Sequence, residues 1–80
     1  QSLVDLAGRV EAIVVVGGKE SANTRWLHQV AVGTGRPAWH VEGAADLPPQ
    51  IGRFRAVGIS AGASTPESLI AEVEAALAAM

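Results

Sequence analysis

The amino-acid sequence predicts an α/β fold, a small three-layer domain in which a parallel sheet of three or four strands is flanked by helices. Residues 13–16 (IVVV) are consecutive apolar β-formers without polar alternation, which is typical of a strand covered on both faces. Residues 55–60 contain a second apolar run, AVGI, and each run ends in a glycine turn that leads into a helix. Right-handed crossovers between such strands give a parallel sheet. The 80 residues are predicted to form a single domain, residues 1–80.

The first half of the chain is predicted to contain two helices and a strand. Residues 1–8 fit the end of a helix, with Gly8 just past its last turn. The first strand covers about residues 12–16. A helix over about residues 22–32 follows, and Gly33 and Gly35 stop it. The apolar stripe of this helix consists of Trp26, Leu27, Val30 and Ala31.

The second half is predicted to add two strands and a long helix. Residues 37–41 form a short strand, which tolerates a proline only at its first position. One helical turn fits around residues 44–47 before two prolines break it. The third strand covers residues 55–60, and the last helix runs to about Ala79. Its apolar stripe consists of Leu69, Ile70, Val73 and Leu77.

Composition excludes several classes of function. The net charge of −2 gives no electrostatic reason to expect binding to nucleic acid or to an anionic membrane. The sequence has no cysteine, which excludes ligation of zinc or of an iron–sulfur cluster by thiolates of this chain. Its apolar runs are far shorter than a membrane span, and no signal peptide is recognised at its start. We therefore expect a cytoplasmic location and no metal site.

The turn after the first strand has the features of an anion-binding site. Gly17 and Gly18 end the strand and let a ligand approach the backbone closely. Ser21 is a good N-cap for the next helix, and Asn23 adds a second polar side chain beside the same free amides. The positive end of the helix dipole points to the same place. The pattern matches neither the dinucleotide-binding fingerprint nor the P-loop, so it does not name a nucleotide.

Residues 61–67 (AGASTPE) repeat this arrangement after the third strand. Thr65 is predicted to cap the last helix, because Pro66 fits its first position, and Glu67 suits the positive end of the dipole. That assignment leaves Ser64 free to face an anion. Ligands of parallel sheets collect at the carboxyl ends of the strands. If the first and third strands are neighbours, both turns and both helices point to one site there.

The two turns resemble those of a known enzyme family. GGKESANTRWL (residues 17–27), followed about forty residues later by VGISAGASTPESLI (residues 57–70), is similar to the C-terminal third of 4-hydroxy-3-methylbut-2-enyl diphosphate reductase, the LytB-type iron–sulfur enzyme of the non-mevalonate isoprenoid pathway. The resemblance covers nearly the whole chain. It implies an oxidoreductase that dehydroxylates its substrate to isopentenyl and dimethylallyl diphosphate. It also implies that this chain is the diphosphate-binding third of a three-domain enzyme.

The resemblance assigns roles to individual residues. Ser21 and Asn23 match the Ser-x-Asn diphosphate contacts of the family, and Ser64 matches the serine of its AGAS turn. Ala22 stands where some members have a second serine, so one hydroxyl contact of those members is absent here. Four residues are candidates for a supporting role: Gly18, Lys19, Ala22 and Thr65. For Lys19, a solvated side chain is the favoured interpretation and screening of phosphate charge is the alternative.

The catalytic parts of the family have no counterpart in these 80 residues. The resemblance implies a 4Fe–4S cluster held by three cysteines, substrate-binding histidines and a proton-delivering glutamate, all in upstream domains of the same enzyme. It also implies an electron donor such as ferredoxin or flavodoxin. We expect no catalytic residue in this chain and no activity from it alone. The alternative is a free-standing module that binds a phosphorylated ligand or serves only as an interaction domain.

The histidines and tryptophans are not assigned to the anion site. His28 lies at the margin of a helix stripe and is predicted to be a surface residue. His40 and Glu42 point to the same side near the end of a strand, where they form an acid–base pair or are simply exposed. Trp26 and Trp39 are predicted to be packing residues. If the chain is a fragment, the alternative is that either lies on the face that a missing domain covers.

Overall fold

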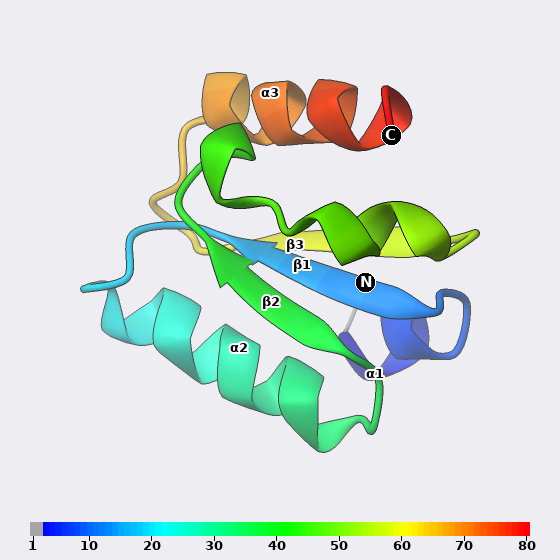
Figure 1. Cartoon of the computed structure of the whole chain (residues 1–80). Coiled ribbons are helices and arrows are strands. Elements are labelled where there is room, and N and C mark those ends of the chain that lie inside the picture. Colours follow the sequence, from blue (N-terminus) through cyan, green and yellow to red (C-terminus); the bar gives the residue numbers. More distant parts are fainter. Residues whose placement is uncertain (1–2) are drawn as a thin grey trace.

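The structure is a computed structural model, and it describes residues 3–80. A central sheet separates two layers of helices (Figure 1), which confirms the predicted three-layer α/β fold. None of the helices in the described residues is long and apolar enough to cross a membrane. The strands are β1 (Ala12–Val16), β2 (Ala38–Val41) and β3 (Val57–Ala61), and the helices are α1 (Leu3–Ala7), α2 (Ala22–Gly33), α3 (Glu67–Ala78) and the short 3-10 helices η1 (Ala44–Asp46) and η2 (Pro49–Arg53).

The sheet is parallel with the order β2-β1-β3, so the first and third strands are neighbours. Val16, the last residue of β1, is in register with Val41 of β2 and with Ala61 of β3. All three strands therefore end in one row. The segments that follow β1 and β3 leave the sheet side by side at this carboxyl edge.

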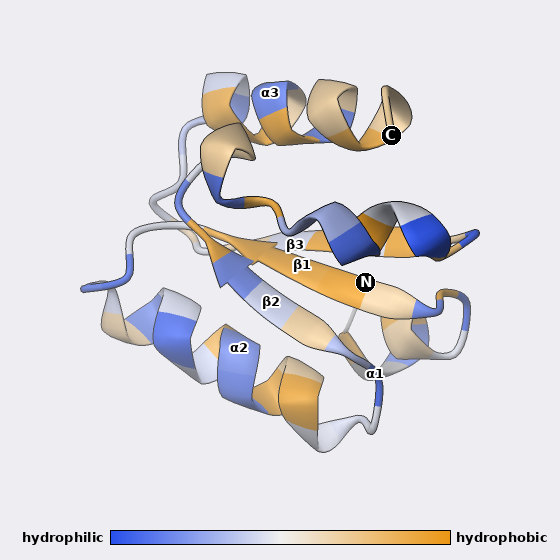
Figure 2. Ribbon diagram, viewed as in Figure 1, coloured by the Kyte–Doolittle hydropathy of each residue, from blue (hydrophilic) through white to orange (hydrophobic). Residues whose placement is uncertain are grey.

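The core forms on both faces of β1, whose residues are all buried. Ile13 and Val15 pack against α1 and α2, whereas Val14 and Val16 pack against α3 and η2. Figure 2 shows β1 as a hydrophobic band through the centre of the molecule. This two-sided burial is what the unbroken IVVV run predicts, because alternate side chains of a strand point to opposite faces.

The structure differs from the sequence prediction at two elements of the second half. β3 begins at Val57 instead of residue 55. The backbone N–H of Arg55 donates to the Glu11 carboxylate and therefore makes no hydrogen bond within the sheet. The helix η2 was not predicted. It starts directly after Pro48, and its buried side chain Ile51 anchors it against the core.

Two further predictions concern the helices, namely the helix end at residues 1–8 and the buried face of α2. Gln1 and Ser2, which belong to the predicted helix end at residues 1–8, lie outside the described residues. Trp26 does not pack into the core of this chain, because 59% of its surface is exposed, and this agrees with the predicted alternative of a face covered by another domain. The buried face of α2 instead runs along Thr24 and Ala31, with Leu27 partly buried between them.

Candidate anion-binding site

The turn between β1 and α2 has the predicted local structure. Gly17 adopts a φ of 154°, which side chains rarely allow, and its N–H donates to the Val41 carbonyl over 3.0 Å. Ser21 has an extended backbone, and its Oγ accepts from the Thr24 N–H over 3.3 Å. The structure thus confirms Ser21 as the N-cap. The amides of Ala22 and Asn23 are among the first of the helix, where no carbonyl of the same helix can accept from them.

The turn between β3 and α3 is built differently from the prediction. Thr65 does not cap α3. Its hydroxyl donates to the Val16 carbonyl over 3.1 Å, and Pro66 occupies the N-cap position with a ψ of 142°, so the helix begins one residue later than predicted. The Thr65 N–H donates to the Gly62 carbonyl over 3.0 Å, which closes a tight turn with Ala63 and Ser64 at its exposed tip.

The two turns contact one another at the carboxyl edge. The N–H of Ala63 donates to Oδ1 of Asn23 over 3.1 Å, and the Gly62 N–H donates to the Val16 carbonyl over the same distance. Thr24 lies between Gly17 and Gly62, close to both. Because the Asn23 carbonyl oxygen accepts from Ala63, its two amide hydrogens remain as donors. The start of α2 thus meets the turn that leads into α3. This contact depends on β1 and β3 being neighbours, which the sequence left as a condition.

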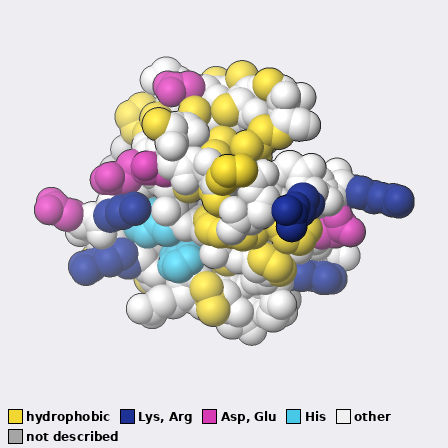
Figure 3. Space-filling view, viewed as in Figure 1, with side chains coloured by type: hydrophobic (Ala, Val, Ile, Leu, Met, Phe, Trp, Pro, Cys, Tyr) yellow, Lys and Arg dark blue, Asp and Glu magenta, His cyan; other side chains and the backbone are white. Residues whose placement is uncertain are grey.

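The charges around the turns have both signs. The Lys19 N–H donates to the Glu42 carboxylate over 3.1 Å, and the Glu42 N–H donates to the Asp46 carboxylate over 2.9 Å. Figure 3 shows basic and acidic side chains together at this edge, next to the two histidines. Side-chain charge therefore gives no strong attraction for an anion here. Any attraction for an anion would have to come from helix ends and backbone amides.

His40 is neither simply exposed nor paired with Glu42. Its Nε2 lies 3.1 Å from the Gly17 carbonyl, and this nitrogen must carry the proton because a carbonyl oxygen only accepts. His28 is half-buried, with its Nε2 3.4 Å from the Ala38 carbonyl and its ring centroid 5.7 Å from that of His40. Both histidines thus hold backbone in place. The bond from His40 supports the Gly17 turn directly.

A metal centre does not fit the described residues. No group of three or more His, Asp or Glu side chains in residues 3–80 is arranged to hold a metal ion. The sequence contains no cysteine, so it offers no thiolate for an iron–sulfur cluster.

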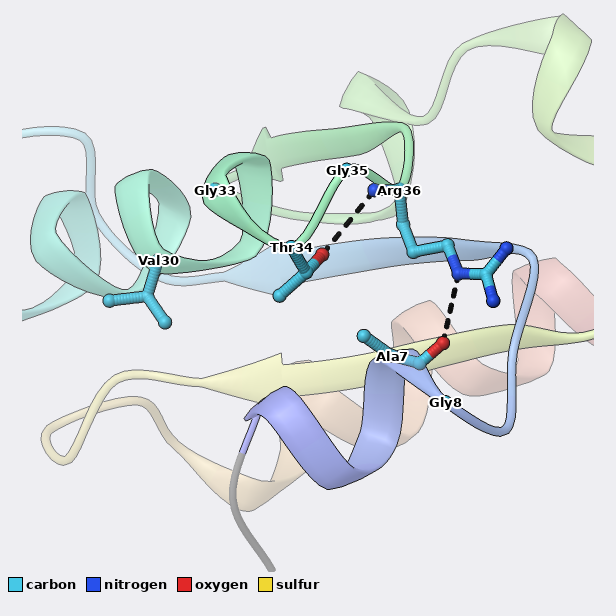
Figure 4. Close-up of a pocket in the computed structure, with 7 residues that line it drawn as sticks. All are labelled: Ala7, Gly8, Val30, Gly33, Thr34, Gly35 and Arg36. Atoms are coloured by element: carbon cyan, nitrogen blue, oxygen red, sulfur yellow. Dashed lines mark hydrogen bonds between the residues drawn. The ribbon is translucent and has the colours of Figure 1, made fainter.

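A cleft of about 610 Å³ lies at the opposite edge of the sheet. Figure 4 shows Arg36 reaching across it, where its Nε donates to the Ala7 carbonyl over 2.9 Å. The cleft is bordered by segments that precede β1 and β2, so it is remote from the two turns. None of the predicted site residues lines it. The residues that line it are Ala7, Gly8, Val30, Gly33, Thr34, Gly35 and Arg36.

Sequence reasoning missed Thr24, the residue that contacts both turns. Its exposed fraction is only 1%, although it is polar and lies in the first turn of α2. The spacing of residues in the sequence does indicate that Thr24 is buried. Thr24 precedes Leu27 and Ala31 by three and seven residues, which places it on the apolar face of the helix.

Comparison with known proteins connects this chain to one family. The family model described as LytB protein matches residues 1–78. The chain is 49% identical over 73 residues to the 4-hydroxy-3-methylbut-2-enyl diphosphate reductase of Treponema denticola, covering 91% of this chain and 25% of that protein. It is 57% identical over 72 residues to the protein of the same name from Treponema pallidum, covering 90% of this chain and 19% of that protein.

Solved structures agree with this result. A structure of (E)-4-hydroxy-3-methyl-but-2-enyl diphosphate reductase, described as the terminal enzyme of the non-mevalonate pathway, superposes with a TM-score of 0.92 at 37% identity, covering 98% of this chain and 28% of that one. The corresponding reductase from Plasmodium falciparum gives a TM-score of 0.78 at 26% identity, covering 91% of this chain and 22% of that one. The chain thus spans about a quarter of the length of the proteins it matches.

Proposed function

This chain belongs to the LytB protein family, and from that premise we propose that it is the diphosphate-binding part of a 4-hydroxy-3-methylbut-2-enyl diphosphate reductase. Such an enzyme removes the allylic hydroxyl of its substrate by reduction, giving isopentenyl and dimethylallyl diphosphate. In this proposal the 80 residues are the C-terminal domain of a larger three-domain enzyme. Their task is to hold the charged end of the substrate, not to perform the redox step.

The contact between the two turns is the observation that supports this role. The hydrogen bond from Ala63 to Asn23 joins the start of α2 to the turn before α3, so backbone amides of both segments lie close together. A diphosphate is an anion with many acceptor oxygens and needs several donors at close range. Backbone amides and hydroxyls meet that need without requiring a strongly basic surface.

Each residue carried over from the family has a matching donor in this arrangement. Ser64, exposed at the tip of its turn, offers a hydroxyl, and Asn23 offers its side-chain amide hydrogens. Ser21 also has an O–H to donate, because its oxygen accepts from Thr24. Ala22 contributes only its backbone amide.

Three further residues have supporting roles in the proposal. Gly18 is exposed, and a side chain built on it would meet nothing within 4 Å, so it leaves open space for the ligand. Lys19 has an exposed side chain that can screen phosphate charge. Thr65 supports the site indirectly, through its bond to the end of β1.

The redox chemistry belongs to other parts of the proposed enzyme. A 4Fe–4S cluster, held by cysteines of the upstream domains, would supply the electrons for the reduction, and this chain has no cysteine to bind it. The cluster cysteines, the substrate-binding histidines and the docking site of a ferredoxin or flavodoxin would all lie in the upstream domains. Residues 3–80 supply the binding of the diphosphate.

A segment exchange tests the proposal. The matching 73 residues of the Treponema denticola reductase are replaced by the residues of this chain that align with them, and the reduction of 4-hydroxy-3-methylbut-2-enyl diphosphate is measured. We expect an active chimera in which Ser64→Ala raises KM about tenfold, since a hydrogen bond to a charged group contributes roughly 1.5–3 kcal/mol. Ser68→Ala is the matched control because it removes another exposed serine hydroxyl. Equal KM values for the two variants would contradict the assigned role of Ser64.

A further inference from the structure

The hydroxyl of Thr24 is buried without a hydrogen bond. Thr24 is 1% exposed, and its Oγ1 has no partner within residues 3–80. A buried hydroxyl left unpaired lowers the stability of the folded state. Valine has nearly the same shape and would avoid this cost. The presence of threonine here therefore calls for an explanation in terms of function.

The hydroxyl is directed to the place where the two turns meet. A threonine in a helix often donates to a carbonyl of the preceding turn, but this one does not. A Cβ built on Gly17 would come within 2.5 Å of Thr24 Oγ1, and a Cβ built on Gly62 would come closer still. The oxygen thus fills the space that these two glycines leave between the ends of β1 and β3. This space is the inner side of the proposed diphosphate site, beside the first amides of α2.

One exposed contact bridges the two turns at this point. The Ala63 N–H donates to Oδ1 of Asn23 over 3.1 Å, and both residues are exposed. Exposed backbone hydrogen bonds of loops are the ones that open most readily. Opening this bond would free the Ala63 N–H and the whole Asn23 carboxamide, and would give access to the hydroxyl below them.

We propose that the Thr24 hydroxyl is a binding group for the diphosphate, which reaches it when the hydrogen bond between Asn23 and Ala63 opens. This inference rests on the proposed function, since it takes the anion at these turns to be the substrate diphosphate. The hydroxyl donates to a phosphate oxygen, and the same oxygen or its neighbour replaces Asn23 as the acceptor of the Ala63 N–H. Binding thereby supplies the partner that the free chain lacks.

Two substitutions separate the hydroxyl from the shape of the side chain. Thr24→Val removes the oxygen and keeps the branched shape, and Thr24→Ser keeps the oxygen. Inorganic pyrophosphate is titrated into the 80-residue chain and its variants, followed by amide NMR signals, and unfolding in urea is measured without ligand. We expect Thr24→Val to weaken pyrophosphate binding about tenfold or more. Its urea midpoint should be equal to or above that of the original chain. Thr24→Ser should bind within about threefold of the original.

Each alternative result would overturn the inference. Unchanged pyrophosphate affinity in Thr24→Val, with Ser64→Ala still weakening it, would refute the role of Thr24 and leave the proposed function standing. A lower urea midpoint in Thr24→Val would show that the hydroxyl already has a structural partner. Equal losses of affinity in Thr24→Val and Thr24→Ser would assign the effect to packing. Absence of pyrophosphate binding by the original chain would refute both proposals.

Discussion

Gly17 and Gly18 are adjacent, yet their surroundings differ sharply. A side chain at Gly17 would meet Thr24 at 2.5 Å and Thr65 at 3.1 Å, and its φ of 154° disfavours any Cβ. A side chain at Gly18 would meet nothing within 4 Å. Gly17 is therefore required by the contact between the turns. Gly18 instead has open space beside it, and leaving that space for a ligand is the role proposed for it.

This difference predicts opposite results for two alanine substitutions. Gly17→Ala should lower the free energy of unfolding by about 2 kcal/mol, because the new methyl group overlaps the Thr24 side chain. Gly18→Ala should change it by no more than about 0.5 kcal/mol. Urea unfolding followed by circular dichroism measures both values. Equal effects of the two substitutions would show that the turns are not held in contact through Thr24.

The short helix α1 is attached to the sheet at a third glycine. A Cβ on Gly58 of β3 would lie 2.8–2.9 Å from three carbons of the Leu6 side chain. Leu3 and Ala7 of the same helix belong to the core cluster on that face, so α1 contributes to the fold although it has only five residues. Helices of this length are not stable by themselves. The close packing of Leu6 against Gly58 is therefore one of the contacts that keep α1 in place.

Replacing Gly58 should loosen α1 selectively. We expect Gly58→Ala to destabilise the chain by about 1–3 kcal/mol and to increase amide hydrogen exchange in residues 5–8 more than in α3. Gly33→Ala is the matched control, since a Cβ there has no neighbour within 4 Å. Unchanged exchange in α1 after Gly58→Ala would mean that Leu6 can move aside and that the helix is held elsewhere.

The accuracy of sequence prediction varied with the kind of physical signal. The IVVV run and the Ser21 cap were predicted correctly, because hydrophobic pattern and capping chemistry act over a few neighbouring residues. The cap at Thr65 was wrong by one residue, since its hydroxyl is used by the end of β1, far away in sequence. The contact of Asn23 with Ala63, forty residues apart, also depended on strand order. Neighbouring residues carry no information about such pairings.

The core of the domain is thin, and this limits the stability of the entire chain. Two clusters, one on each face of β1, contain most of the buried hydrophobic side chains. An 80-residue domain has a free energy of unfolding of about 4 to 12 kcal/mol. The unpaired hydroxyl of Thr24 and the tightly fitted Gly17 both lie at the carboxyl edge, which fits a chain that gives up some stability for a binding site there.

The most direct test of the central claim, that the two turns form one anion site, is a titration of the isotope-labelled chain with inorganic pyrophosphate. Amide signals are followed for all residues. The predicted result is a set of shifts that saturate together and are confined to residues 18–24 and 62–67, with weak affinity because the remaining donors would belong to upstream domains. Small, uniform shifts along the chain, or shifts at one turn without the other, would contradict the claim.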